Sequence, residues 1–206
     1  MIVITADQRN SRSTPDAVAS AIADLNRTWG SALVLSAERT AGDEIQLLAD
    51  SGATALGVAL QLTRTGSWSV GMGAGSVRRP LGDHVRESAG PAFIAAHDAV
   101  DRAKRSVTHC AVTADPEHPR AEGIEALLDL LLIQRGRRSA EGWQLHDLLQ
   151  SGLSQADAAE RLGITPQSVS QRARVASLRV ENAATVALAS LLDDLDAEVD
   201  GENGGS

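Results

Sequence analysis

The sequence has very few aromatic residues and a single cysteine. Aromatic side chains make up 2% of the 206 residues, as one phenylalanine, three tryptophans and no tyrosine. The core must therefore be built from aliphatic side chains, and a site that stacks single-stranded bases on aromatic rings is not expected. Cys110 has no partner for an internal disulfide, and no Cys/His spacing typical of a zinc site is present.

Long apolar runs are also missing. The longest run, around residues 127–133, is much shorter than the roughly 20 residues of a membrane span, and the N-terminus lacks the charged and then apolar layout of a signal peptide. The contents of hydrophobic residues, 43%, and charged residues, 22%, are typical of globular proteins. We therefore expect a soluble, cytoplasmic protein without a membrane partner.

Positive charge is scarce except in one part of the chain. The formal net charge is -8 overall, and it divides into -4 for residues 1–133, +3 for residues 134–179 and -7 for residues 180–206. Affinity for nucleic acid depends strongly on neutralising phosphates, so residues 134–179 are the part whose charge suits DNA. An excess of this size also occurs as ordinary surface variation.

Apolar patterning divides the chain into two domains. Residues 1–114 contain predicted strands at 2–6, 31–38, 44–49, 68–77 and 109–113, and predicted helices at 13–29, 53–62 and 90–104. The first six of these elements follow the β-α-β-β-α-β order of ferredoxin-like folds, which predicts an α+β protein. Residues 115–120 are a predicted linker, residues 121–199 a helical domain, and the acidic residues 200–206 a disordered tail.

Two local patterns in the first domain predict a helix start and a strand with one face free of side chains. Ser13 and Thr14, followed by a proline, are typical of a hydroxyl-capped helix start. Glycines 71, 73 and 75 fall on one face of the predicted strand 68–77 and leave that face without side chains. Either another backbone or a ligand is expected to lie against it.

The clearest motif spans residues 153–175, with the sequence LSQADAAERLGITPQSVSQRARV. Ser154 and Asp157 are spaced to cap a first helix, Gly163 suits a positive-φ turn, and Thr165 with the following proline caps a second helix. Val169 is the inward residue of that second helix. Two short helices packed across a tight turn are typical of a helix-turn-helix.

The second helix of this motif presents polar and basic side chains on its exposed face. Glutamine and arginine make bidentate contacts to base edges in the major groove, and hydroxyls suit phosphate contacts. The alternative is an ordinary helical hairpin with a solvated polar face. We expect double-stranded DNA as a partner, contacted by Thr165, Gln167, Ser168, Ser170, Gln171, Arg172 and Arg174.

A single helix-turn-helix contacts only a few base pairs, so specific binding usually requires two copies. We therefore expect a homodimer. The final predicted helix, residues 180–199, is apolar enough to pair with a second subunit, and it could equally pack onto its own domain. Its apolar residues are Ala183, Val186, Leu188, Leu191, Leu192 and Leu195.

Three carboxylates lie at predicted strand ends in the first domain. Asp7 ends the first strand, and Asp43 and Glu44 lie at the turn of the predicted hairpin. In a β-α-β-β-α-β sheet these strands are adjacent, so Asp7 and Asp43 would meet at one edge. Paired carboxylates suit a magnesium ion and phosphates, although both residues are also common in turns at strand ends.

Several short blocks resemble the SatD family. They are residues 41–48 (AGDEIQLL), 68–75 (WSVGMGAG), 90–92 (GPA) and 4–7 (ITAD). SatD-like proteins end in a helix-turn-helix, so the resemblance covers nearly the whole chain. The first domain is more distantly similar to the palm-like domain of nucleotidyl cyclases, including GGDEF diguanylate cyclases. That similarity implies a metal-binding role for Asp7 with Asp43 or Glu44, although Ala41 and Ile45 depart from the GGDEF pattern.

Three hypotheses follow. The first is a DNA-binding transcription regulator whose palm-like domain senses a ligand, with a nucleotide as a candidate effector, or mediates dimerisation. The second is a metal-dependent nucleotidyl-transfer or cyclase-like enzyme with an accessory helix-turn-helix, using magnesium as its cofactor. The third is an adaptor whose helical hairpin docks on other proteins. No catalytic residue is assigned.

Overall fold

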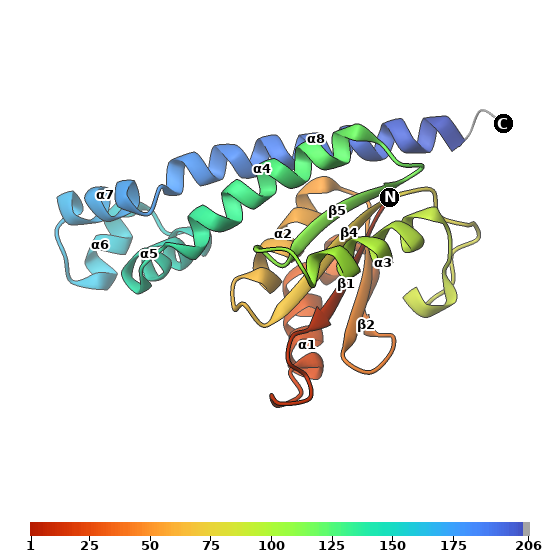
Figure 1. Ribbon diagram of the computed structural model, residues 1–206. Coiled ribbons are helices and arrows are strands. Elements are labelled where there is room, and N and C mark those ends of the chain that lie inside the picture. Colours follow the sequence, from red (N-terminus) through yellow and green to blue (C-terminus); the bar gives the residue numbers. More distant parts are fainter. Residues whose placement is uncertain (204–206) are drawn as a thin grey trace.

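The computed structural model describes residues 1–203 and is an α+β protein built on a five-stranded mixed sheet. The strand order is β2-β3-β1-β4-β5, with β4 and β5 parallel and the other neighbours antiparallel. Strands and helices follow one another along the chain in the order predicted from sequence (Figure 1). The strands are β1 (Ile2–Gln8), β2 (Leu33–Arg39), β3 (Glu44–Ala49), β4 (Trp68–Gly75) and β5 (Cys110–Asp115).

Helices cover both faces of the sheet. Ile2, Ile4 and Ala6 of β1 are buried on the face covered by α1 (Val18–Trp29) and α2 (Gly52–Thr63). Val3 is buried on the opposite face, which is covered by α3 (Pro91–Ala103). Because successive strand residues point to opposite faces, the central strand must be apolar on both. The sheet with α1, α2 and α3 is called the sheet unit below.

The bare glycine face of β4 lies directly under α3. A Cβ atom at Gly73 would lie 2.1 Å from the backbone nitrogen of Ala96, and one at Gly71 would lie 2.2 Å from that of Val100. These distances leave no room for any side chain. The glycines therefore accommodate a second backbone rather than a ligand, which decides between the two alternatives.

Two long helices continue the core of the sheet unit. The helices α4 (Pro119–Gly136) and α8 (Leu178–Asn203) lie side by side over one face of the sheet unit (Figure 1). Leu188, Leu192 and Leu195 of α8 are buried in the same cluster as the sheet residues. The apolar side of the final helix is thus used within its own chain, while Ala183 and Val186 remain exposed.

Three short helices lie at the far end of α4 and α8 (Figure 1). They are α5 (Ala140–Gln150), α6 (Gln155–Leu162) and α7 (Pro166–Val175), and they are called the α5–α7 cluster below. Leu145, Ala158, Ala159 and Val169 form a small separate core between them. This core is the centre of the motif found in the sequence.

The structure corrects the predicted start of the first helix. The hydroxyls of Ser13 and Thr14 donate to the carbonyl of Asn10 in a turn, and α1 begins only at Val18. The side chain of Gln8 explains the delay, because it bonds to the backbone of Pro15 and of Ala17 at 2.8 and 2.9 Å. The intervening segment is therefore held in a non-helical conformation.

Three boundaries also differ from the prediction. β1 continues to Gln8, so Asp7 is the penultimate residue of the strand, and its pair with Glu44 is the last of the β1–β3 ladder. Because β5 reaches Asp115 and α4 starts at Pro119, only residues 116–118 separate them. The predicted tail is helical as far as Asn203, and residues 204–206 lie outside the described part of the chain.

Over residues 1–203 no single helix is both long enough and apolar enough to cross a membrane. Together α7 and α8 meet those two criteria, but a bend of 49° separates them.

Candidate nucleic-acid interface

Local side-chain bonds define both helix starts of the α6–α7 hairpin. The hydroxyl of Ser154 accepts from the Asp157 backbone at 3.1 Å, and the Asp157 carboxylate accepts from the Ser154 backbone at 3.1 Å, which completes a capping box. The Ser154 hydroxyl also donates to the Asp157 carboxylate at 2.7 Å, and this bond, with the one from the Ser154 backbone, lowers the pKa of Asp157 below its ordinary value. Gly163 ends α6 with a φ of 63°, and Thr165 accepts from the backbone of Ser168 at 3.2 Å. Each predicted capping role is confirmed.

One side of α7 is buried and the other faces outward. Val169 is fully buried against Leu145 of α5 and the small residues Ala158 and Ala159 of α6. Small side chains on α6 allow the two helices to approach closely at the turn. The hairpin therefore presents the polar side of α7 as a fixed surface.

The structure places all seven predicted DNA-contacting residues on or next to this surface. Arg172 is half-buried, and the other six are exposed: Thr165, Gln167, Ser168, Ser170, Gln171 and Arg174. Thr165 and Ser168 already bond to each other in the cap, at 3.0 Å. Arg174 donates to the Gln171 side chain. The amide of Gln167 and the guanidinium groups are thus the main donors available to a partner.

A basic residue that the sequence analysis missed joins this surface. A hollow of about 550 Å³ between the start of α5 and α7 is lined by Arg137 together with Gln167, Gln171 and Arg172. Arg137 follows the end of α4, well outside the recognised motif. The exposed charge around α7 is consequently more positive than the motif alone indicates.

Of the three carboxylates predicted at strand ends, two lie opposite each other in the sheet. Asp7 and Glu44 lie directly opposite each other in the β1–β3 ladder, whereas Asp43 lies in the turn, where its carbonyl accepts from the Gln8 backbone at 3.1 Å. The hydroxyl of Thr40 donates to the Glu44 carboxylate. The predicted pair of Asp7 and Asp43 is therefore replaced at the ladder by Asp7 and Glu44.

Lys104, at the end of α3, neutralises Asp7. Its ammonium nitrogen lies 2.9 Å from Asp7 Oδ2 and 3.1 Å from Asp101 Oδ1. Burial lowers the pKa of Lys104, but the hydrogen bonds with both carboxylates outweigh burial and raise it overall. Among the side chains of residues 1–200, which the structure describes, no three His, Cys, Asp or Glu residues gather as a metal-binding group. A magnesium ion at Asp7 would have to displace this ammonium group.

Arg135, Arg138 and Glu181 form a buried charged cluster, called the buried node below. It connects α4, α5 and α8, and the sequence analysis did not predict it. Glu181 of α8 accepts hydrogen bonds from both Arg135 and Arg138, with all three residues more than 90% buried. The two guanidinium groups lie 4.9 and 4.3 Å from the ring centroid of Trp143 in α5. Arg135 also donates to the carbonyl of Leu60 in α2 at 3.3 Å. The node therefore links the α5–α7 cluster to the sheet unit.

A comparison of the chain with protein-family models, with curated proteins and with solved structures finds no match. The SatD-like blocks nevertheless fall on defined elements. Residues 41–48 form the turn before β3 and most of that strand, and residues 68–75 form β4. Residues 90–92 begin α3. The resemblance thus stays a prediction.

Proposed function

We propose that this chain is a cytoplasmic, sequence-specific DNA-binding transcription regulator in which α6 and α7 form a helix-turn-helix. One observation carries the proposal: α7 buries Val169 and exposes Gln167, Gln171 and Arg174 on its opposite side. These side-chain types read base edges in the major groove. Thr165 caps α7, the helix that would enter the groove, and Ser154 caps α6, which packs against it.

The sheet unit would serve as a sensor or a dimerisation unit. Its β2-β3-β1-β4 order, in a β-α-β-β-α-β chain, supports a ferredoxin-like, palm-like fold of the kind that the SatD resemblance implies. The ion pair between Asp7 and Lys104 favours this role over the cyclase-like alternative, because a catalytic cation would compete with a resident ammonium group.

The outer side of α4 and α8 is the surface that we propose for the homodimer. Leu127 and Leu130 of α4 and Val186 of α8 are exposed by 48, 66 and 66%. Exposed apolar side chains on adjacent helices are unfavourable in water, and a second copy would bury them. The resulting pair of hairpins could contact two half-sites on DNA.

The test is an electrophoretic mobility shift of the full chain on the DNA upstream of its own coding sequence, over a range of salt concentrations. We expect a specific complex of two chains, with the free protein at twice 21.5 kDa by light scattering. Arg172→Ala and Arg174→Ala should each weaken binding about tenfold and reduce the salt slope by about one where a phosphate contact is lost.

Arg12→Ala is the matched control, because it removes an exposed arginine from the distant β1–α1 turn. It should leave both affinity and salt slope unchanged. Equal affinity of all three variants and the wild type for DNA would contradict the recognition role of α7. Absence of any DNA complex at low salt would favour the adaptor hypothesis instead.

A further inference from the structure

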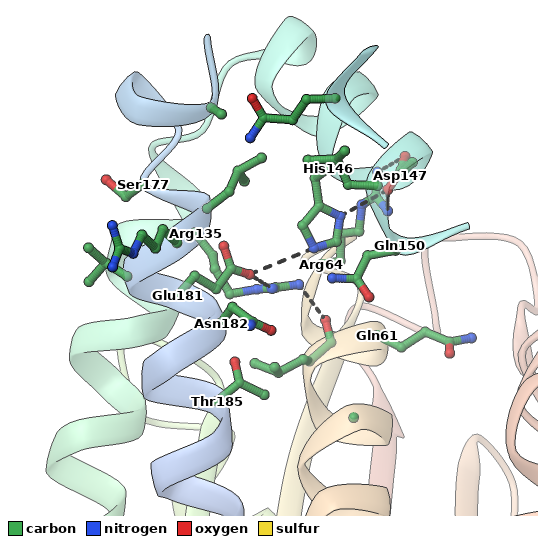
Figure 2. Close-up of a pocket in the computed structure, with 18 of the residues that line it drawn as sticks. Gln61, Arg64, Arg135, His146, Asp147, Gln150, Ser177, Glu181, Asn182 and Thr185 are labelled. Atoms are coloured by element: carbon green, nitrogen blue, oxygen red, sulfur yellow. Dashed lines mark hydrogen bonds and ion pairs between the residues drawn. The ribbon is translucent and has the colours of Figure 1, made fainter. Parts of the chain in front are cut away.

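A large cleft separates α2 of the sheet unit from the α5–α7 cluster. Its volume is about 1200 Å³, and residues of α2, α5, α7 and α8 line it. Figure 2 shows Arg64, which directly follows α2, close to Asp147 and Gln150 of α5, with Asn182 of α8 across from them. Typical small-molecule sites hold roughly 300–1,000 Å³. The cleft is therefore large enough for a ligand of nucleotide size.

The lining of the cleft is positively charged although the whole chain is acidic. Four arginines, Arg64, Arg135, Arg174 and Arg179, face two carboxylates. Both carboxylates are already engaged: that of Asp147 by Arg64, through two bonds of 2.8 Å, and that of Glu181 by the buried node. Burial lowers the pKa of His146, the one histidine in this lining, which favours its neutral form. The positive charge left without a carboxylate belongs to Arg174 and Arg179.

Neutral donors complete the lining. Gln61 uses its carbonyl oxygen to accept from the Trp29 indole at 2.8 Å, which leaves its NH₂ group as a donor. Gln150, Asn182 and Thr185 make no side-chain hydrogen bond with residues 1–200, whose side chains the structure describes. Arginines combined with amide and hydroxyl donors suit a ligand that carries several anionic oxygens.

We propose that this cleft binds a phosphate-bearing small molecule, with Arg64 and Arg179 as its charged contacts. Arginine contacts phosphate oxygens in the same bidentate geometry that Arg64 now uses for Asp147. The phosphate therefore competes with Asp147 for Arg64. This site lies between the sheet unit and the helical cluster, and it is separate from the Asp7 edge of the sheet.

Binding would also change how the α5–α7 cluster is held, a step that rests on the proposed DNA-binding function. The bond between Arg64 and Asp147 joins α2 to α5, and Ser170 and Arg174 of α7 line the same cleft. The junction of α7 and α8 at Ser177 has a φ of 55°. A ligand that opens the Arg64–Asp147 pair favours a different position of α7, and DNA affinity changes by the coupling between the two sites.

The first experiment measures binding of ATP and of inorganic tripolyphosphate to the full chain in EDTA, by isothermal titration calorimetry with Trp143 fluorescence as a second signal. Trp143 contacts Arg64, whose guanidinium carbon lies 4.2 Å from the ring centroid. We expect one site per chain and no binding of adenosine. Failure of both phosphate compounds to bind would overturn the proposal.

Variants with opposite expected signs separate a ligand contact from a structural role. Arg64→Ala and Arg179→Ala should each weaken ATP binding about tenfold. Asp147→Asn should strengthen it about twofold to fivefold, because it removes the competitor for Arg64. A structural role alone would make Arg64→Ala and Asp147→Asn change affinity in the same direction. Arg12→Ala is the control and should bind like the wild type.

Three further outcomes keep this inference distinct from the proposed function. Loss of ATP binding in Asp7→Ala, with normal binding in Arg64→Ala, would place the nucleotide at the sheet edge and overturn the cleft assignment. Specific DNA binding that ATP does not alter would overturn the coupling and leave the DNA-binding function intact. ATP binding at the cleft without any DNA binding would contradict the DNA-binding function, together with the coupling that rests on it, and leave the cleft assignment intact.

Discussion

The sheet unit and the α5–α7 cluster achieve stability in different ways. The sheet unit has a continuous core on both faces of its central strands, with large side chains such as Ile4, Leu47 and Met72 fully buried. The core of the cluster consists of four buried residues, two of which are alanines. Because burial of apolar area scales with stability, the cluster depends much more on helix caps and on its attachment to α4 and α8. The surface proposed to contact DNA therefore lies on the part that opens most easily.

The largest expected effect is a loss of stability when a side chain is introduced into the tightly packed sheet unit. Gly73→Val would place a side chain where the backbone of α3 lies, 2.1 Å from Ala96. Because backbone cannot yield there, we expect a loss of more than about 4 kcal/mol or no soluble protein, measured by urea unfolding. Gly123→Ala in α4 is the control: a Cβ there meets nothing within 4 Å, and the variant should be about 0.5–1 kcal/mol more stable.

The second prediction tests the attachment of the cluster. Glu181→Ala leaves the buried guanidinium groups of Arg135 and Arg138 without their carboxylate, which typically costs about 3–5 kcal/mol. With Trp29 and Trp68 replaced by phenylalanine, we expect the Trp143 fluorescence to change at a lower urea concentration than the far-ultraviolet circular dichroism of the whole chain. Glu198→Ala, on the same helix, removes a partly exposed pair with Arg120 and should cost about 1 kcal/mol or less. Coincident transitions in Glu181→Ala would show that the cluster and the sheet unit unfold together.

The same comparison explains what could be predicted from the sequence. The α6–α7 hairpin was predictable because its signals are local: Ser154 bonds three residues ahead, as does Thr165, and Gly163 acts within its own turn. The order of the strands was predictable for the same reason, from apolar periodicity. The start of α1 was wrong because a residue outside the local pattern, Gln8, holds the segment before it.

The charged contacts were not predictable, because they join residues far apart in the sequence. Lys104 reaches Asp7 only once α3 has packed on the sheet. Arg135 and Glu181 meet because α4 and α8 run side by side, and a polar residue in an apolar stripe was the only signal of that contact. The cleft beside Arg64 has no local signal at all, since residues of seven helices, α1, α2 and α4 to α8, line it.

The smallest expected effect is a dependence of the stability of the α5–α7 cluster on pH. His146 of α5 lies beside the node, with Asp147 at 3.2 Å and Glu181 at 3.8 Å, and burial lowers its pKa from the ordinary value of 6.5 despite these carboxylates. When the pH falls below 6.5, His146 takes up a proton more readily in the unfolded chain than in the folded chain. The free energy of unfolding is therefore undiminished above pH 6.5 and decreases as the pH falls towards the folded pKa of His146.

Urea midpoints followed by Trp143 fluorescence at about pH 7.5 and about pH 5.5 should therefore show a less stable cluster at the lower pH. His146→Gln should reduce this difference, because glutamine does not titrate. His97→Gln, an exposed change on α3, should keep the wild-type difference. If His146→Gln showed the full wild-type dependence, the acid sensitivity of the cluster would come from its carboxylates, and the neutral histidine would contribute packing alone.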